Sequence, residues 1–190
     1  EDNGLRERLT KVIDLIITKL YNPQTHHLIL YCDSNWNNLD DIDSYWADIE
    51  TSWLLTEAAE ALGDPEVIGR CRKVALELAD ASLKEGINDG AMMYERHKDK
   101  IRKDASWWCQ AELGVGCINA WQLTGEQSYL DSAVRTWNFI KSRMIDKEYG
   151  EWFRTVLEDG TPRYKEPKAS MWNCPYHNSR MGFEIDTRLK

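Results

Sequence analysis

Hydrophobic residues recur every three or four positions through most of the chain, a spacing typical of amphipathic helices. The first such stretch runs from Leu5 to Tyr21, and its predicted apolar stripe consists of Leu9, Val12, Ile13, Ile16 and Leu20. Further helices are predicted at about residues 43–62, 65–84, 104–123 and 127–145, with a sixth after Pro175. The pattern therefore predicts an all-α fold.

Glycine and proline separate these helices. Gly63 ends the second predicted helix, and Asp64 and Pro65 then supply a capping residue and a first helical residue for the third. Gly125 ends the fourth helix in the same manner. Helices two and three, and likewise four and five, are thus predicted to form hairpins.

The two hairpins repeat one pattern, in the segments EALGDPEVIGRCRKVALELA and WQLTGEQSYLDSAVRTWNFI. Each hairpin is followed by a short strand-like or turn segment, GAMMYERH or GEWFRTVLEDGTP, and HHLILYCDSNW after the first helix looks like the end of an earlier unit. Repeated helical hairpins must stack to bury their inner faces, as an open solenoid or as a closed α/α toroid. About three units predict an arc rather than a ring.

Length and composition add two points. With 190 residues the chain can bury a sizeable core, and we expect residues 1–190 to form a single domain. Nine Trp and eight Tyr stand against three Phe. Trp and Tyr each join an apolar face to a hydrogen-bonding edge. Their excess over Phe therefore indicates a partly solvated surface such as a cleft, in addition to the Trp and Tyr residues that simply fill the core.

Charge and cysteine content reduce the number of function classes that fit this chain. A net charge of −8 without a basic run argues against nucleic acid, and no apolar run is long enough for a membrane span. We expect no signal peptide, although a first residue other than Met leaves a processed or truncated start open. The five cysteines are Cys32, Cys71, Cys109, Cys117 and Cys174. Because their number is odd and no CxxC pair occurs, they suggest reduced thiols in a cytoplasmic protein and no metal site.

The second predicted helix places a carboxylate among tryptophans. Glu50 shares a helix face with Ala47 and Leu54, and Trp46 and Trp53 lie around the same face. A carboxylate in such surroundings is a candidate for a tuned pKa. The alternative is an acid that merely favours the start of a helix.

The fourth helix begins with two adjacent tryptophans. Trp107 and Trp108 cannot face the same way, so one is expected in the core and the other on a cavity wall. Gln110 and Glu112 add polar groups nearby. Indole faces stack on the C–H surfaces of sugar rings, and carboxylates and amides bind hydroxyl groups, so this combination suggests a carbohydrate ligand.

The segment SMWNCPYHNSR gathers the most reactive side chains. Pro175 fixes the entry to a helix, which places Tyr176 and His177 in its first turn. Histidine can accept and return a proton near neutral pH, whereas a capped structural histidine is the alternative. The other histidines, in a turn or a charged loop, look less suited to this role: His26, His27 and His97.

Three segments, DIETSWLL, WWCQAE and EWF…DG.P…WNCPYHNSR, together resemble the N-acylglucosamine 2-epimerase superfamily, most closely the cellobiose 2-epimerases. They occur in the family's order, and they correspond to about the C-terminal half of such an enzyme. The resemblance implies an (α/α)6 barrel, of which this chain would form half, with short β-hairpins between helix pairs.

The resemblance also implies a reaction, epimerisation at C2 of a reducing-end sugar. One histidine removes the C2 proton, an enediol-like intermediate forms, and a second histidine returns a proton to the opposite face. No metal or nucleotide cofactor is needed. The implied roles are acid/base for His177, polarisation of the partner base or substrate for Glu50, orientation of polar groups for Arg180, and sugar stacking for Trp172 and either Trp107 or Trp108.

One departure from the family pattern changes the expectation. The family usually has a histidine directly before DIE, and this chain has Ala47. Since an alanine cannot transfer protons and the N-terminal half is absent, the chain alone is expected to be an impaired epimerase or isomerase, or a non-catalytic sugar-binding half-barrel. A glycoside hydrolase using Glu50, Glu112 and Glu151 is a further alternative, but it leaves His177 without a role.

The expected partners follow from the same reasoning. The ligand would be a mono- or disaccharide with a glucose-type reducing end. A half-barrel would leave apolar edges exposed, which favours self-association or binding of a separate N-terminal half.

Overall fold

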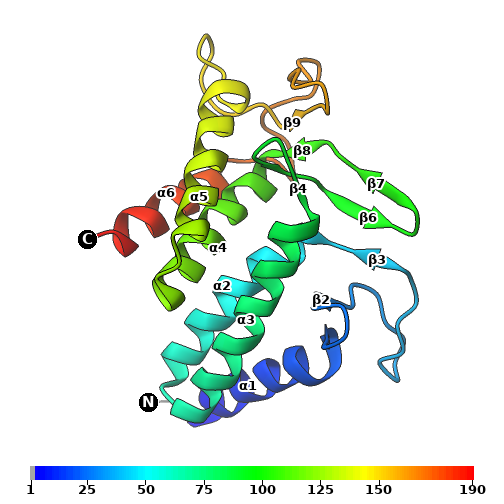
Figure 1. Ribbon diagram of the computed structural model, residues 1–190, viewed down its shortest axis with the longest axis vertical. Helices are drawn as coiled ribbons and strands as arrows, with labels where there is room; N and C mark the ends of the chain where they lie inside the picture. Colours follow the sequence, from blue (N-terminus) through cyan, green and yellow to red (C-terminus); the bar gives the residue numbers. More distant parts are fainter. Residues whose placement is uncertain (1–2) are drawn as a thin grey trace.

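Helices make up most of the computed structural model, which describes residues 3–190 (Figure 1). Two π-helical turns, η1 (Ile16–Leu20) and η2 (Ile140–Met144), continue the first and fifth helices. The α-helices are α1 (Asn3–Leu15), α2 (Tyr45–Leu62), α3 (Pro65–Glu85), α4 (Trp107–Thr124), α5 (Gln127–Phe139) and α6 (Tyr176–Arg188). The predicted all-α class is confirmed.

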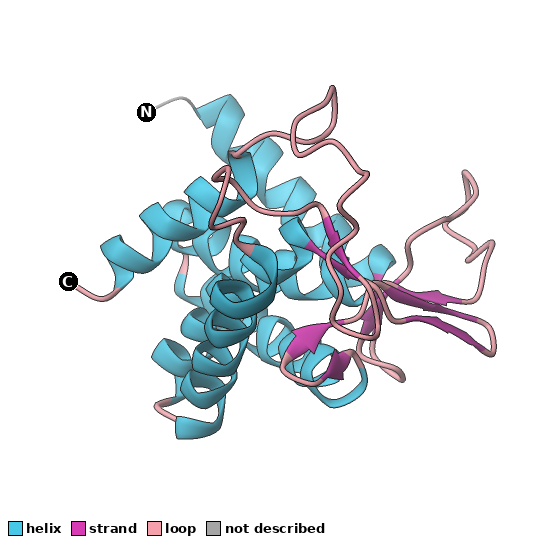
Figure 2. Ribbon diagram, turned by 90° about the horizontal axis from the view of Figure 1, so that it is seen from above, coloured by secondary structure: helices cyan, strands magenta, loops and turns pink. Residues whose placement is uncertain are grey.

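The strands are two or three residues long and lie with the loops on one side of the helical body (Figure 2). The largest sheet has the order β3-β6-β7 and is antiparallel, with Ile42 opposite His97 and Arg96 opposite Ile101. Three two-stranded pairs complete the described sheets: the short hairpins β1-β2 and β4-β5, and the pair β8-β9, whose strands lie on either side of α4 and α5 in the sequence. The strands are β1 (Tyr21–Asn22), β2 (His27–Leu28), β3 (Ile42–Asp43), β4 (Ile87–Asn88), β5 (Ala91–Met92), β6 (Glu95–His97), β7 (Lys100–Arg102), β8 (Ala105–Ser106) and β9 (Thr155–Val156).

The helices form two layers. α2, α4 and α6 make an inner row in which α4 packs against both neighbours, and α1, α3 and α5 lie outside this row. α3 packs against α2, and α5 packs against α4, as the two predicted hairpins require. α4 is buried around almost its whole circumference because other elements cover it on several sides, whereas the outer helices keep polar faces in solvent.

A glycine allows the two central inner helices to approach closely. A Cβ atom at Gly116 of α4 would lie 2.6 Å from Cγ1 of Ile49 in α2. The Ile49 side chain fills the space that a Cβ would need, and the Ile49 carbonyl oxygen would lie 3.1 Å from it, so α2 and α4 pack closely at this point. Since Ile49 directly precedes Glu50 in α2, this contact helps to set the separation of α2 and α4 next to the site described below.

Some element boundaries differ from the sequence prediction. α4 begins at Trp107 rather than near residue 104, because Ala105 and Ser106 pair with β9 as strand β8. The apolar stripe of the first helix is only partly buried: Ile13 is 1% exposed, but Val12 is 51% exposed. Val12 therefore lies on the exposed side of the predicted stripe.

The five cysteines are free thiols, of which Cys71, Cys109 and Cys117 are buried. Burial raises the pKa of Cys71 to about 11 and that of Cys117 to about 12, so both remain protonated near neutral pH. Within residues 3–190, none of the helices combines the length and apolar character that a membrane crossing requires.

Candidate active site

The first two turns of the three inner helices bring four charged or ionisable side chains together. Glu50 comes from α2, Glu112 from α4, and His177 and Arg180 from the start of α6. Pro175 precedes α6 and allows a helix to start there, which places both α6 residues in its first turns. Residues more than 60 positions apart in the sequence thus meet at one end of the inner row.

Glu112 is the central acceptor of this cluster. Its Oε1 accepts hydrogen bonds from Nδ1 of His177 at 2.7 Å and from Nη2 of Arg180 at 2.6 Å. Its Oε2 accepts from the indole Nε1 of Trp53 at 2.9 Å. A carboxylate that is 1% exposed requires such partners, and here both oxygens have them.

The bond to Glu112 also fixes the chemistry of His177. A carboxylate only accepts hydrogen bonds, so Nδ1 carries the proton, and in the neutral ring Nε2 is the basic nitrogen. The rings of Trp108, Trp107 and Tyr176 surround the imidazole at centroid distances of 5.4, 6.0 and 4.9 Å. The side chain is 21% exposed, so the ring is held in place yet remains open to a ligand.

Arg180 connects the two carboxylates. Its Nη2 donates to Oε1 of Glu50 and to Oε1 of Glu112, at 2.6 Å in each case. Burial raises the pKa of Glu50, and repulsion by Glu112 adds to this, although Arg180 opposes both. The guanidinium lies over the rings of Trp53 and Tyr176, and Nη1 donates to the Tyr176 hydroxyl at 2.7 Å.

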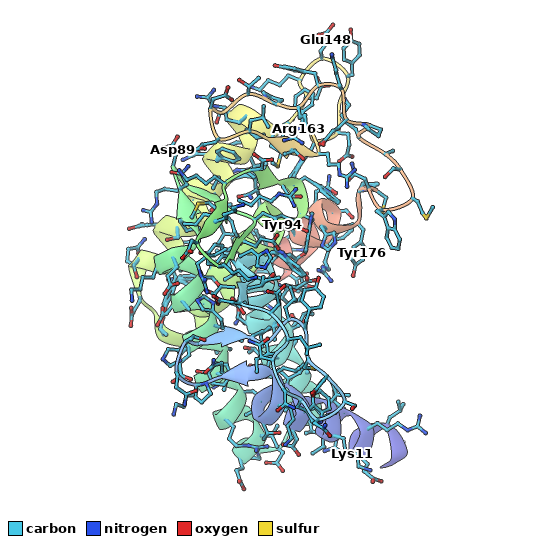
Figure 3. The ribbon with its side chains drawn as sticks, turned by 90° about the vertical axis from the view of Figure 1, so that its right-hand side faces the viewer. Lys11, Asp89, Tyr94, Glu148, Arg163 and Tyr176 are labelled. Atoms are coloured by element: carbon cyan, nitrogen blue, oxygen red, sulfur yellow. The ribbon has the colours of Figure 1, made fainter. Side chains whose placement is uncertain are left out.

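Aromatic rings form a wall beside the imidazole. Trp108 lies between His177 and Trp46, whose ring centroid is 4.6 Å away, and Tyr94 closes the group at 6.2 Å from Trp108. Tyr94 and Tyr176 lie on the same side of the molecule, well above Lys11 of α1 (Figure 3). Trp107 is 6% exposed and belongs to the core, as expected for one member of this pair, and Trp108 is half-buried.

Other residues considered in the sequence lie outside this cluster. Trp172 is 81% exposed on the loop before α6. Ala47 lies one turn before Glu50 on α2 and offers only a methyl group there. Gln110 is buried and bonds to the backbone of Met92 in both directions, which holds β5 against α4. Glu151 is exposed and accepts a hydrogen bond from Asn178.

A buried ion pair that the sequence reasoning missed supports the start of α2. His27 was expected in an ordinary turn, but it is 2% exposed, and its Nδ1 lies 2.7 Å from Oδ2 of Asp48. Its Nε2 faces Glu85 at 3.3 Å, and Oδ1 of Asp48 accepts the Leu28 amide. The pair thus ties β2 to α2 two residues before Glu50.

Among the residues that the structure describes, two groups of side chains have a spacing that could suit a cation, with ligand atoms within 4.8 Å of one another. In the group of Glu50, Glu112 and His177, the Arg180 guanidinium already bridges the carboxylates. In the group of His27, Asp43 and Glu85, Arg96 pairs with Asp43. In each group, an arginine side chain therefore already neutralises acidic side chains.

The geometry defines a class of protein: stacked α/α hairpins whose inner helices hold a histidine–carboxylate pair among indole rings. The sequence profile of the N-acylglucosamine 2-epimerase (GlcNAc 2-epimerase) family matches residues 1–178. The chain belongs to this family.

Relatives in this family cover nearly the whole chain. It is 37% identical over 187 residues to a cellobiose 2-epimerase of Bacteroides fragilis, covering 97% of this chain and 48% of the relative. A cellobiose 2-epimerase of Ruminococcus albus is 38% identical over 185 residues, at 97% and 46% coverage. The chain therefore spans about half the length of the curated relatives it matches.

Solved structures agree with the fold. A sugar epimerase from a ruminal bacterium superimposes with a TM-score of 0.96 at 36% identity, covering 98% of this chain and 48% of that one. A D-mannose isomerase gives a TM-score of 0.81 at 18% identity, with 98% and 51% coverage, and supports the fold alone. The expected architecture, half of an (α/α)6 barrel, is confirmed.

Proposed function

We propose that this chain is the C-terminal half of a sugar 2-epimerase or isomerase barrel and that His177 transfers the proton at C2 of an aldose. The observation that supports this most directly is the 2.7 Å bond between Nδ1 of His177 and buried Glu112, which leaves Nε2 as the base. The ligand proposed is a mono- or disaccharide with a glucose-type reducing end, because relatives with 37% and 38% identity to this chain are cellobiose 2-epimerases.

The proposed step starts from the open-chain aldose. His177 Nε2 takes the proton from C2, the C–H electron pair forms the C1–C2 double bond, and the carbonyl oxygen takes up the charge. The imidazolium is stabilised by Glu112, which already accepts from Nδ1. Trp108 and the exposed Trp172 are the proposed stacking surfaces for the sugar rings.

Ala47 determines the proposed product. Inversion at C2 needs a proton donor on the opposite face, and a methyl group cannot supply one. His177 can instead return its proton to C1 on the same face, while the proton of the C2 hydroxyl passes to O1, and the aldose becomes a ketose. We therefore propose impaired epimerisation, with isomerisation as the residual reaction.

Deuterium exchange tests this proposal. Glucose, mannose and cellobiose are each incubated with the chain in D2O, and deuterium at C1 and C2 is followed by NMR. Exchange that disappears in His177→Gln supports the proposal. A folded wild-type chain that shows no exchange above the rate in buffer contradicts it.

The second candidate is a non-catalytic sugar-binding half-barrel, and Ala47 is the residue that favours it. Calorimetry with the same sugars separates the two functions. Binding that weakens in Trp172→Ala, without exchange in D2O, would identify the binding module. Release of glucose from cellobiose would instead revive the hydrolase alternative, which is disfavoured because Glu112 has no oxygen free of a protein donor.

A further inference from the structure

The phenol of Tyr176 is a second group beside the imidazole that can both give and accept a proton. Tyr176 is the first residue of α6 and directly precedes His177. Its ring stands nearly perpendicular to the imidazole, with a centroid distance of 4.9 Å. Tyr176 is 54% exposed and lies on the same side of the molecule as Tyr94 of the aromatic wall (Figure 3), so a ligand that reaches His177 can also meet its hydroxyl group.

One hydrogen bond determines how this hydroxyl group can act. Nη1 of Arg180 donates to the phenolic oxygen of Tyr176 at 2.7 Å. A guanidinium group has no acceptor, so the phenolic oxygen accepts in this bond and its own proton is directed elsewhere. Among the described residues, no side chain or carbonyl group accepts that proton. The hydroxyl group is therefore a donor that a ligand can use.

Arg180 also supports this oxygen after its proton has left. Glu50 and Glu112 both bind Nη2 of Arg180, which leaves Nη1 for Tyr176. The guanidinium carbon lies 4.7 Å from the centroid of the Tyr176 ring. Negative charge that develops on the phenolic oxygen thus meets a charged donor that is already in place.

The proposed isomerisation needs a second proton transfer besides the one from C2 to C1. Once His177 has taken the C2 proton, the charge lies on O1, and the proton of the C2 hydroxyl group must reach O1 before a carbonyl group can form at C2. O1 and O2 are on adjacent carbon atoms, and in a cis-enediol they lie on the same side of the double bond. A single hydroxyl group beside them can therefore serve both oxygens.

The neighbouring carboxylates are less suited to this transfer. Both oxygens of Glu112 already accept hydrogen bonds from protein donors. Glu50 forms an ion pair with Arg180, so it has no proton to give to O1 first. Tyr176 starts with a proton, and the phenolic oxygen can take one back.

We propose that Tyr176 is a further catalytic residue that carries the proton from O2 to O1, an inference that rests on the proposed function of His177. The phenol gives its proton to O1, and Arg180 stabilises the phenolate. The phenolate then takes the proton of the C2 hydroxyl group, and an electron pair of O2 forms the C2–O2 double bond. The electron pair of the C1–C2 double bond takes the proton from Nε2 of His177, so both side chains regain their starting protonation states and the product is a ketose.

Two reactions followed in one sample test this proposal. In D2O, exchange at C2 of glucose needs only His177, whereas the formation of fructose also needs the transfer from O2 to O1. Tyr176→Phe removes the hydroxyl group and keeps the ring beside His177. We expect the ratio of fructose formed to deuterium incorporated at C2, both measured by NMR, to fall at least ~10-fold in this variant.

This ratio separates a chemical role from a structural one. Both products form in the same sites, so the ratio does not depend on how much of the variant is folded. If the two rates fall by the same factor, or if neither falls, Tyr176 does not carry the proton and the proposal is overturned. Tyr149→Phe is the matched control because it removes an exposed hydroxyl group next to Glu148, far from Tyr176 (Figure 3), and it should leave both rates unchanged.

The wild-type chain distinguishes a failure of this inference from a failure of the proposed function. A folded wild type without exchange above the rate in buffer contradicts the role of His177, and the role of Tyr176 with it. Wild-type exchange with an unchanged ratio in Tyr176→Phe overturns the role of Tyr176 alone. Wild-type exchange without any fructose also overturns it, because no proton then passes between the two oxygens.

Discussion

At the scale of single residues, one carboxylate holds the candidate site together. Glu112 accepts hydrogen bonds from Trp53, His177 and Arg180, so it connects α2 and α6 through α4. The same bonds select the tautomer of His177 and place a cation between the two glutamates. Stability and proposed chemistry therefore depend on the same buried oxygen atoms.

Glu112→Gln should be strongly destabilising. The glutamine amide keeps only one acceptor oxygen, and its N–H₂ group would face the N–H groups that now donate to Glu112. We therefore expect the free energy of unfolding to fall by about 3 kcal/mol. Urea denaturation measures the change. Glu151→Gln, which alters an exposed residue, is the control and should change it by less than about 0.5 kcal/mol; equal losses in the two variants would contradict the central role of Glu112.

The buried pair of His27 and Asp48 should make stability depend on pH. Burial lowers the pKa of His27, but Asp48 and its acidic neighbours raise it more, to above the ordinary value. Burial raises the pKa of Asp48 to about 6. Since the folded pair holds its protons to higher pH than the unfolded chain, its contribution is greatest in acid and is lost as pH rises through these pKa values.

The double variant His27→Gln/Asp48→Asn provides the reference for this effect. We expect the unfolding free energy of the wild type, relative to the double variant, to decrease from pH 5 to pH 8. Urea titrations at several pH values measure the difference. A difference that grows with pH would reverse the sign of the linkage and reject it.

The sequence predicted which residue types matter, but not how they connect. Glu50 and His177 were predicted from their neighbours in the sequence and Arg180 from the family resemblance, and the structure brings all three together. The bonds from Glu112 to His177 and to Trp53 span 65 and 59 positions, and the pattern along the chain carries no signal for such contacts. The His27–Asp48 pair was missed for the same reason.

At the scale of elements, Gly116 controls the distance between α2 and α4. Gly116→Ala should destabilise the protein by about 1–3 kcal/mol, because its Cβ would lie 2.6 Å from Ile49 within a packed core. Gly69→Ala on α3 is the matched control: no atom lies within 4 Å of its Cβ position, so it should stabilise the helix by about 0.5–1 kcal/mol. Thermal unfolding of the two variants should move in opposite directions.

Element boundaries were predictable where a local signal exists. Gly63 and Gly125 end α2 and α4 at positive φ, and Asp64 caps α3 by accepting from two backbone amides, as their positions in the sequence suggested. The π-helical turns η1 and η2 continue an apolar pattern that does not distinguish them from α-helix. The start of α4 depends on pairing with β9, about 50 positions later, which a local pattern cannot show.

At the scale of the whole molecule, the proposed reaction needs a proton carrier on each face of the sugar, and position 47 of α2 carries only a methyl group. A single substitution at this position tests the proposed loss of proton transfer.

Ala47→His should raise the rate of deuterium exchange at C2 by at least ~10², if the missing proton carrier limits the reaction. Position 47 lies one turn before Glu50 on the same face of α2, so an imidazole there would have a carboxylate within reach to orient it. Ala47→Asn adds a polar side chain that cannot transfer protons at neutral pH, and it should leave the rate unchanged. Tryptophan fluorescence would show whether both variants bind the sugar equally; equal binding with equal exchange would mean that a group outside position 47 limits the chemistry.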